Sequence, residues 1–145
     1  MNKKIIGYTT GVFDLFHVGH LNILENAKKH CDVLVVGVTT DELAYKLKNK
    51  IPIIPFKDRL ELINSIKFID KVIPEKNVDK FKAWEKIKFD VIFKGSDWKG
   101  TEKWNEYERK FKEVGVKVFY FPYTEKISSS IIRKRLLKRY AEEFE

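Results

Sequence analysis

An almost continuous apolar segment, residues 32–38, places the strongest constraint on how this chain folds. Such a segment is typical of a strand that is buried on both faces inside a parallel sheet. A β-branched and aromatic segment at residues 4–10 precedes it, and residues 18–30 between them carry apolar side chains at helical spacing. Strand, helix and buried strand in succession form a βαβ unit, which requires its two strands to be parallel.

The rest of the chain continues this alternation. Residues 39–42 end the second strand and favour the cap of a short helix, whereas residues 46–55 are too rich in proline to be helical throughout. Further helices are predicted from Lys57 onward, over residues 78–88 and 101–114, and after Ser128; further strands are predicted over residues 70–74, 90–95 and 116–121. Because parallel crossovers are right-handed, the expected fold is a single Rossmann-like α/β domain over residues 1–145, with an open, mainly parallel five-stranded sheet and helices on both faces.

Composition restricts the class of protein and its compartment. An apolar content of 43% favours a folded globule, and one cysteine excludes an intrachain disulfide and fits a reducing compartment. No apolar run approaches the roughly 20 residues that span a bilayer, so a cytoplasmic protein without membrane insertion is expected. The formal charge of +8 is compatible with phosphorylated ligands, nucleic acid or anionic lipid, and does not choose among them.

The segment Gly11–His20 is the strongest candidate for a functional site. It follows the first strand and leads directly into a helix, where free N–H groups and the helix dipole favour phosphate. Its two histidines, His17 and His20, indicate chemistry on a phosphate. Two alternatives remain: the histidines cap or pack the helix, or they bind zinc, which would need carboxylates because His30 and Cys31 are the remaining histidine and cysteine.

Three other loops are expected beside this segment, because ligands of open α/β sheets bind beyond the carboxyl ends of the strands. They are residues 39–41, 95–98 and 123–130. The last of these contains Ser128, Ser129 and Ser130, whose hydroxyl groups could form a second phosphate cradle or an ordinary helix cap.

The motifs resemble those of the HxGH nucleotidyltransferase superfamily. His17-Val18-Gly19-His20 matches the HxGH signature, and Gly11-Val12-Phe13-Asp14 resembles the G-T-F-D that precedes it there. The C-terminal segment 123–130 resembles the R-T-E-G-I-S-T-[TS] element of the cytidylyltransferase branch. It departs from that element at Tyr123, which replaces the arginine, and at Lys126, which replaces the glycine.

Within that branch the chain is most similar to bacterial glycerol-3-phosphate cytidylyltransferases. Residues 72–77 match V-I-P-E-K-N, residues 40–42 match T-D-E, and residues 95–98 resemble G-D-D-W with Ser96 in place of the first aspartate. Lys48 and Lys50 match a K-x-K loop, and Arg59 matches the arginine after it. A further family lysine falls near Lys80 or Lys82.

The resemblance implies transfer of CMP from CTP to a phosphorylated alcohol, glycerol 3-phosphate in the first place, with release of pyrophosphate. It implies catalytic roles for His17, His20 and Lys48. Nucleotide contacts are implied for Gly11, Val12, Phe13, His17, His20, Lys50, Asp97, Thr124, Ile127, Ser128 and Ser129. Contacts with the second substrate are implied for Asp14, Asp41, Lys48, Arg59 and Trp98. It also implies Mg²⁺ carried on the triphosphate without a protein metal site, and a homodimer. No nucleic-acid partner is expected, because the sequence contains no RNA- or DNA-binding motif.

Three alternatives are left open by the sequence. Phosphocholine and phosphoethanolamine cytidylyltransferases share the HxGH and C-terminal elements. FAD synthases, which are adenylyltransferases, share a K-x-P-I-I-P-like loop, matched by residues 50–55, and a serine-rich end. A nucleotide- or nucleic-acid-binding module without catalysis would use the basic last helix, which contains Arg133, Lys134, Arg135, Lys138 and Arg139.

Overall fold

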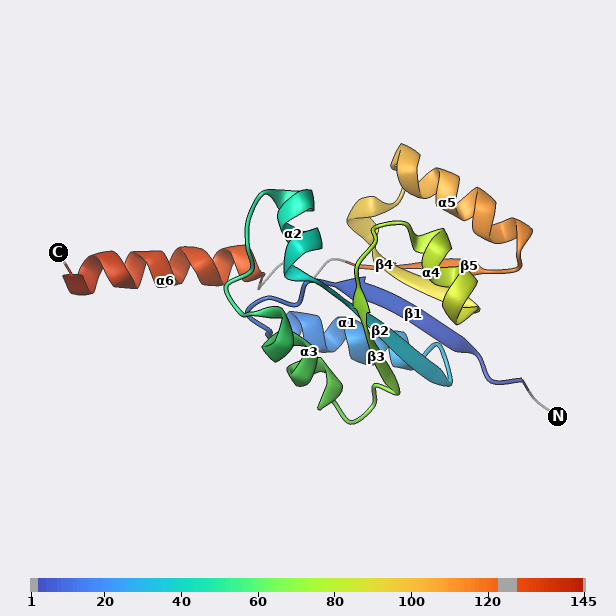
Figure 1. Cartoon of the computed structure of the whole chain (residues 1–145), viewed down its shortest axis with the longest axis horizontal. Helices are drawn as coiled ribbons and strands as arrows, with labels where there is room; N and C mark the ends of the chain where they lie inside the picture. The colour runs from blue at the N-terminus through green and yellow to red at the C-terminus, as the bar shows by residue number, and fades with distance from the viewer. Residues whose placement is uncertain (1–2, 123–127, 145) are drawn as a thin grey trace.

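Five parallel strands form the centre of the molecule, in the order β3-β2-β1-β4-β5 (Figure 1). The computed structural model describes residues 3–122 and 128–144. Every pairing between neighbouring strands is parallel, and Tyr8 of β1 lies between Val35 of β2 and Ile92 of β4. The strands are β1 (Ile6–Gly11), β2 (Val33–Thr39), β3 (Lys71–Glu75), β4 (Val91–Gly95) and β5 (Lys117–Phe121). The predicted open, five-stranded, parallel sheet is therefore confirmed.

Helices cover both faces of this sheet, as predicted. On one face, α1 (Val18–Lys28) and α3 (Phe56–Asn64) bury Leu24 and Ile63 in one apolar cluster with side chains of β2, β4 and β5. On the other face, α4 (Lys80–Ile87) and α5 (Glu102–Glu113) pack around Trp104 and Phe111. Each face has its own apolar cluster, and the buried β2 contributes to both. Burial of β2 on both faces explains the continuous apolar segment in the sequence.

Most element boundaries differ from the predicted ones by one to three residues, and two of these differences have a clear physical cause. The loop predicted over residues 46–55 begins later, because α2 (Asp41–Lys48) continues to Lys48 and ends at Asn49 in a left-handed conformation. Strand β3 continues one residue past Pro74, to Glu75, instead of ending at the proline. Proline is tolerated because β3 is at the edge of the sheet and pairs with β2 alone. The outer side of its backbone makes no hydrogen bonds to a neighbouring strand, so the missing N–H of proline is not needed there.

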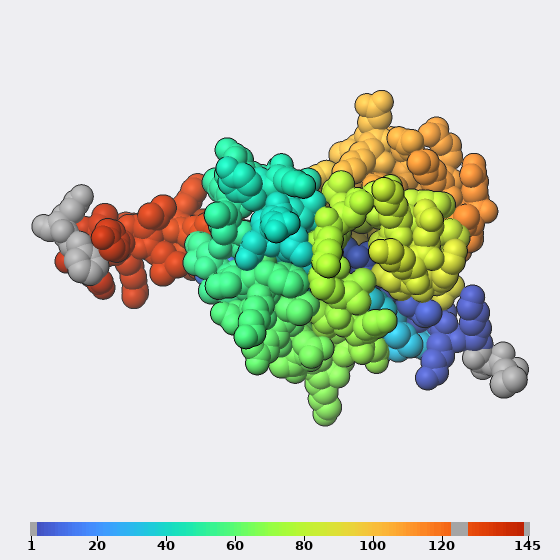
Figure 2. Space-filling view, in the orientation of Figure 1, coloured from blue at the N-terminus to red at the C-terminus, as the bar shows by residue number. Residues whose placement is uncertain are grey.

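The last helix, α6 (Ser129–Phe144), projects beyond the α/β domain, at the end of the molecule opposite the N-terminus (Figures 1 and 2). It is linked to the domain at its start, where Ser129 Oγ donates to the carbonyl oxygen of Asp14. Within the described ranges, no helix combines the length and the apolar character needed to cross a membrane.

Candidate functional site

The turn between β1 and α1 has an unusual backbone. Phe13 and Leu15 both have left-handed backbone angles, with φ of 56° and 49°. Bulky side chains rarely adopt this conformation, and such residues concentrate at functional sites. A Cβ atom on Gly11 would lie 2.8 Å from the Phe13 ring, so the turn also requires a glycine at position 11. The G-V-F-D segment therefore determines the shape of this turn through its local geometry.

The two histidines cap helix α1 and fix each other's orientation. His17 Nδ1 accepts a hydrogen bond from the N–H of Gly19 at 3.0 Å, and His20 Nδ1 accepts from the N–H of His17 at 3.3 Å. The two rings stack with their centroids 3.9 Å apart. Because both Nδ1 atoms accept, the proton of each neutral ring is assigned to Nε2. The capping alternative is thus correct as geometry, and it leaves both Nε2–H groups as donors.

Both imidazoles favour the neutral form. Burial, with a smaller contribution from the nearby His17, lowers the pKa of His20 to about 4, although Asp14 opposes the shift. Burial also lowers the pKa of His17. The His17 Nε2 atom is buried and has no hydrogen-bond partner among the described residues. A buried donor without a partner is costly, so this nitrogen is suited to a ligand acceptor such as a phosphate oxygen.

Asp14 connects three segments that are far apart in the sequence. Its carboxylate accepts the N–H groups of Ile53 and Ile54, both at 2.9 Å, and pairs with the guanidinium of Arg133 in α6 at 2.6 Å. Burial alone would raise its pKa, but the two N–H groups and Arg133 together hold the pKa of Asp14 below its usual range. The carboxylate therefore positions the loop after α2 and the start of α6, and its contact with substrate stays a prediction.

Arg59 and Asp41 pair with each other beside the turn after β1. The Arg59 side chain is buried and donates to the carbonyl oxygens of Val12, Thr39 and Ile54 at 2.7–2.9 Å. It also pairs with Asp41, with a nitrogen–oxygen distance of 2.6 Å. Neither side chain lines the cavity described next. A buried guanidinium is stable here because carbonyl and carboxylate oxygens accept from all three of its nitrogens.

A cavity of about 400 Å³ lies beyond the carboxyl ends of the strands. The turn after β1, the start of α1, the loop after α2, the end of β4 and the start of α6 surround it. Of the predicted loops, residues 95–98 and the described end of residues 123–130 join Gly11–His20 at this cavity, whereas residues 39–41 do not line it. Of the predicted site residues, the cavity is lined by Gly11, Val12, Phe13, Asp14, His17, His20, Lys48, Lys50, Asp97, Trp98, Ser128 and Ser129. Thr124, Ile127, Tyr123 and Lys126 lie outside the described residues.

The start of α6 meets this cavity as predicted from the serine run. Ser128 Oγ accepts the N–H of Ile131 at 3.2 Å, which is an ordinary helix cap. Arg133, one turn later, reaches Asp14 and also lines the cavity. In the sequence Arg133 is one of several basic residues of the last helix, and its place in the first turns after the serine run is the signal that indicates this position.

Two further cavity residues were missed by the sequence analysis. Thr10, at the end of β1, accepts a hydrogen bond from the buried Lys80 at 3.1 Å. Lys80 is also paired with Glu75, which accepts from Thr39 Oγ1. The other missed residue is Lys94, the penultimate residue of β4. Its position at the carboxyl end of a predicted strand was the available signal.

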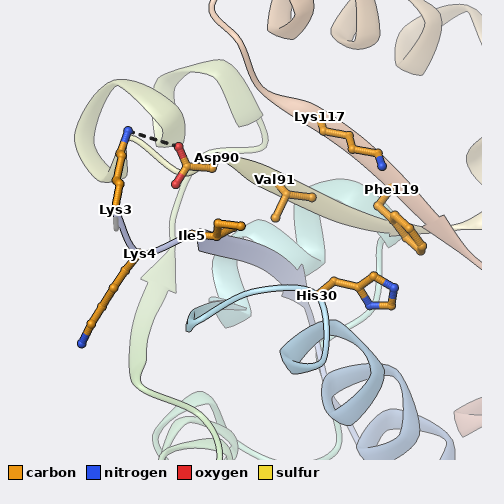
Figure 3. A pocket seen from close by; sticks show the side chains of 8 residues that line it. All are labelled: Lys3, Lys4, Ile5, His30, Asp90, Val91, Lys117 and Phe119. Carbon is orange, nitrogen blue, oxygen red and sulfur yellow. Dashed lines mark ion pairs between the residues drawn. The ribbon is translucent and has the colours of Figure 1, made fainter. Parts of the chain in front are cut away.

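A second cavity, of about 420 Å³, opens at the opposite edge of the sheet (Figure 3). Its floor is apolar and its rim contains Lys3, Lys117 and His30, with Lys3 paired to Asp90 at 3.5 Å. This is the amino-terminal edge of the parallel strands, whereas ligands of such sheets bind at the carboxyl-terminal edge. The described ranges contain no group of three or more histidine, cysteine, aspartate or glutamate side chains that could hold a metal ion.

Comparison with known proteins now identifies the family. The cytidylyltransferase-like family matches residues 8–135. The chain is 38% identical over 133 residues to the glycerol-3-phosphate cytidylyltransferase of Bacillus spizizenii, covering 91% of this chain and 95% of that protein. The chain is a member of the cytidylyltransferase-like family. This cytidylyltransferase-like protein is also 35% identical over 139 residues to the FAD synthase of Thermoplasma acidophilum, covering 93% of this chain and 96% of that protein.

A solved structure supports the fold assignment. The lipopolysaccharide core biosynthesis protein of Thermoplasma volcanium has a TM-score of 0.71 and 34% identity to this cytidylyltransferase-like protein. The match covers 86% of this chain and all of that one. Family membership makes the protein a nucleotidyltransferase, and the predicted resemblance to cytidylyltransferases is confirmed.

Proposed function

We propose that the protein is a CTP:glycerol-3-phosphate cytidylyltransferase, which forms CDP-glycerol and pyrophosphate. The observation that carries the proposal is the convergence of the histidine pair of α1 with the serine cap of α6 at one cavity. Two helix starts and two imidazole donors provide the hydrogen bonds that a triphosphate needs. The relatives named glycerol-3-phosphate cytidylyltransferase support the choice of both substrates.

The electrostatics of the cavity suit phosphoryl chemistry. A triphosphate and a phosphomonoester repel each other, so positive groups must hold them in line and stabilise the charge that develops at the α-phosphate. In the proposed mechanism His17 and His20 donate from Nε2 to the nucleotide phosphates. Lys50 binds the same phosphates, and Lys48 holds the phosphate of the acceptor. The acceptor oxygen attacks the α-phosphorus directly, and the bond to pyrophosphate breaks.

Mg²⁺ belongs to this proposal as a companion of the triphosphate. The ion favours phosphate oxygens and water together with few protein ligands, and the described residues offer no larger cluster of ligating side chains. When bound, it would neutralise charge on the leaving pyrophosphate. We further propose a cytoplasmic location, because the single cysteine fits a reducing compartment.

Substrate identity is tested by crossing nucleotides with acceptors. We expect pyrophosphate release with CTP and glycerol 3-phosphate in the presence of Mg²⁺, and none with phosphocholine or phosphoethanolamine. The same assay includes ATP with FMN, because FAD synthases are among the relatives and share the loop matched by residues 50–55. Turnover with ATP and FMN alone would replace the proposed activity by flavin adenylylation.

The proposed homodimer is assigned to helix α6. Leu136 and Leu137 are exposed on this helix, which projects from the domain (Figure 2). Exposed apolar side chains on a projecting helix are suited to packing against a second copy of the chain. We expect the wild type to have twice the monomer mass by light scattering after size exclusion, and L136E to run as a monomer. Lys138 lies on the opposite side of the helix, so K138E is the matched control and should remain dimeric. A wild-type monomer, or a dimeric L136E, would contradict this interface.

A further inference from the structure

Lys94 is a charged side chain at the proposed active site that the mechanism above leaves without a role. Its ammonium nitrogen lies 4.8 Å from the ring centroid of Trp98 and 5.5 Å from that of Trp104. Trp104 is buried in the core, whereas Trp98 and Lys94 itself line the cavity. The faces of the indole rings stabilise a positive charge, but an indole has no acceptor atom for a hydrogen bond from the ammonium group. The ammonium group therefore has capacity to donate to a ligand.

The charged groups around Lys94 do not neutralise it. Glu75 of β3 is nearby, but its carboxylate already accepts from Lys80 and from Thr39. Burial lowers the pKa of Lys94 to about 8; Lys80 of α4 and Lys103 of α5 lower it, while Glu75 and Asp97 raise it. A hydrogen-bond acceptor on the ammonium group would stabilise its charged form and so oppose the lowering of the pKa by burial and the two lysines.

The sheet order separates the cations of the cavity into two groups. Lys48 and Lys50 come after β2 in the chain, and β2 lies on one side of the central β1. Lys94 lies at the end of β4 and Asp97 directly after it, and β4 lies on the other side of β1. The histidines and the start of α6 lie with β1, so the reacting phosphate is expected between the two groups. In an in-line reaction at the α-phosphorus the acceptor oxygen and the departing pyrophosphate lie opposite each other, and the oxygen that carries the nucleoside lies to the side of that line. Lys48 and Lys50 are assigned above to the acceptor phosphate and the nucleotide phosphates, so the anionic groups lie toward the β2 side and the β4 side is left for the nucleoside.

Lys94 and Asp97 together match the edge of an aminopyrimidine. The ammonium group donates, and the carboxylate accepts. Cytosine carries an amino group that donates beside a ring nitrogen and a carbonyl oxygen that accept, whereas uracil replaces the amino group with a second carbonyl. We propose that Lys94 is a nucleotide-binding residue that donates to the acceptor atoms of the cytosine base, next to Asp97, which accepts from the amino group. This inference rests on the proposed function only in that a nucleotide occupies this cavity.

Calorimetric titration of CTP tests the role of Lys94. We expect K94M to weaken CTP binding by about tenfold or more, the effect of losing a good contact with a base edge. K99M is the matched control: Lys99 lies near the ring of Tyr120, outside the cavity, and CTP binding should be unchanged. The loss in K94M should be equally large for CMP, because the contact is made to the nucleoside half. A loss seen with CTP but absent with CMP would place Lys94 on the outer phosphates and overturn the inference.

The pH dependence gives an independent readout that a merely structural role would not move. Wild-type affinity for CTP should fall as the pH rises above about 8, because free Lys94 then loses its proton. K94R remains charged in this range, so its affinity should not show this decrease. D97N should improve UTP relative to CTP, because the amide can donate to the extra carbonyl of uracil.

The outcomes separate this inference from the proposed function. CTP binding that depends on Lys94, without turnover of glycerol 3-phosphate, would contradict the proposed acceptor and support the role of Lys94. Normal turnover of CTP and glycerol 3-phosphate by K94M, with unchanged KM for CTP, would support the proposed function and overturn the role of Lys94. Failure of the wild type to bind CTP would overturn both.

Discussion

Replacement of His20 by alanine is expected to lower kcat/KM for pyrophosphate release by about a hundredfold to a thousandfold, the usual effect of removing one donor to a developing anionic charge. His20 presents its Nε2–H group to the cavity because Nδ1 is occupied by the N–H of His17. The donor is held in place before substrate arrives, and it is neutral. H17A should have an effect of similar size, since His17 Nε2 is also held without a protein partner among the described residues.

A matched variant separates catalysis from capping. His17 is the cap of α1, so H17A removes a cap worth about 1 kcal/mol as well as a donor. Asparagine is a good cap residue whose side-chain oxygen can replace Nδ1, but it lacks the distant Nε2 donor. H17N should therefore melt close to the wild-type temperature and still lose most of its activity, measured by circular dichroism and pyrophosphate release. An active H17N would show that His17 serves only to cap the helix.

The neutral state of the histidines has its own signature in the pH profile. With the pKa of His20 lowered to about 4 by burial, kcat/KM should show no decrease between about pH 6 and about pH 7.5. A mechanism that needs an imidazolium in the free enzyme would instead lose activity through this range.

The lowered pKa of His20 also affects the stability of the protein. In the unfolded chain His20 has its ordinary pKa of about 6.5, whereas in the folded protein its pKa is about 4. The unfolded state therefore binds more protons between these two values, and the free energy of unfolding should decrease as the pH falls from about 6.5 toward about 4. H20N should reduce this decrease, measured as the midpoint of urea unfolding.

Replacement of Arg59 by methionine is expected to lower the free energy of unfolding by about 3–5 kcal/mol, because it leaves a carboxylate and several carbonyl oxygens without their donor. Arg59 connects the turn after β1, the end of β2, the start of α2 and the loop before α3 through its contacts with Val12, Thr39, Asp41 and Ile54. The measurement is the midpoint of urea unfolding, compared at equal slope. R109M removes an exposed arginine of α5 and should change stability by less than about 0.5 kcal/mol.

This experiment also distinguishes the two roles considered for Arg59. A residue that only supports charge in the substrate pocket would leave the urea midpoint unchanged and raise KM for the acceptor. The buried network instead predicts that even R59K is destabilised, because lysine cannot donate from three positions in one plane. A stable R59K with a raised KM would return Arg59 to the substrate site.

The fold was largely predictable from local pattern. The apolar residues of β2 and the helical spacing in α1 depend on neighbours within a few positions, and the carboxyl-edge rule then placed the loops. Short-range patterns were less reliable at boundaries. Helix α2 runs on to Lys48, and β3 accommodates Pro74 because it is an edge strand, which cannot be known before the strand order is known.

The candidate site divides in the same way. The histidine motif and the serine run were visible in the sequence, because both are local signals of a helix start. The functions of charged residues were not. Asp14 lines the cavity and also holds the loop after α2 and the start of α6, and Arg59 is engaged by backbone carbonyl oxygens outside the cavity. Lys94 falls within the strand predicted over residues 90–95 and has no predicted role in the site, but it lines the cavity.

The sequence by itself therefore determined the order and type of the elements, the parallel sheet and the position of the phosphate-binding turns, because each depends on contacts within a helix, a strand or a single turn. Only the tertiary structure decided which charged groups neutralise one another and which remain for a ligand. The reason is distance along the chain: Asp14 meets Arg133 across 119 positions, and Lys80 meets Thr10 across 70. A charge that is paired by such a contact supports the site, and a charge that the fold leaves in the cavity is available to bind.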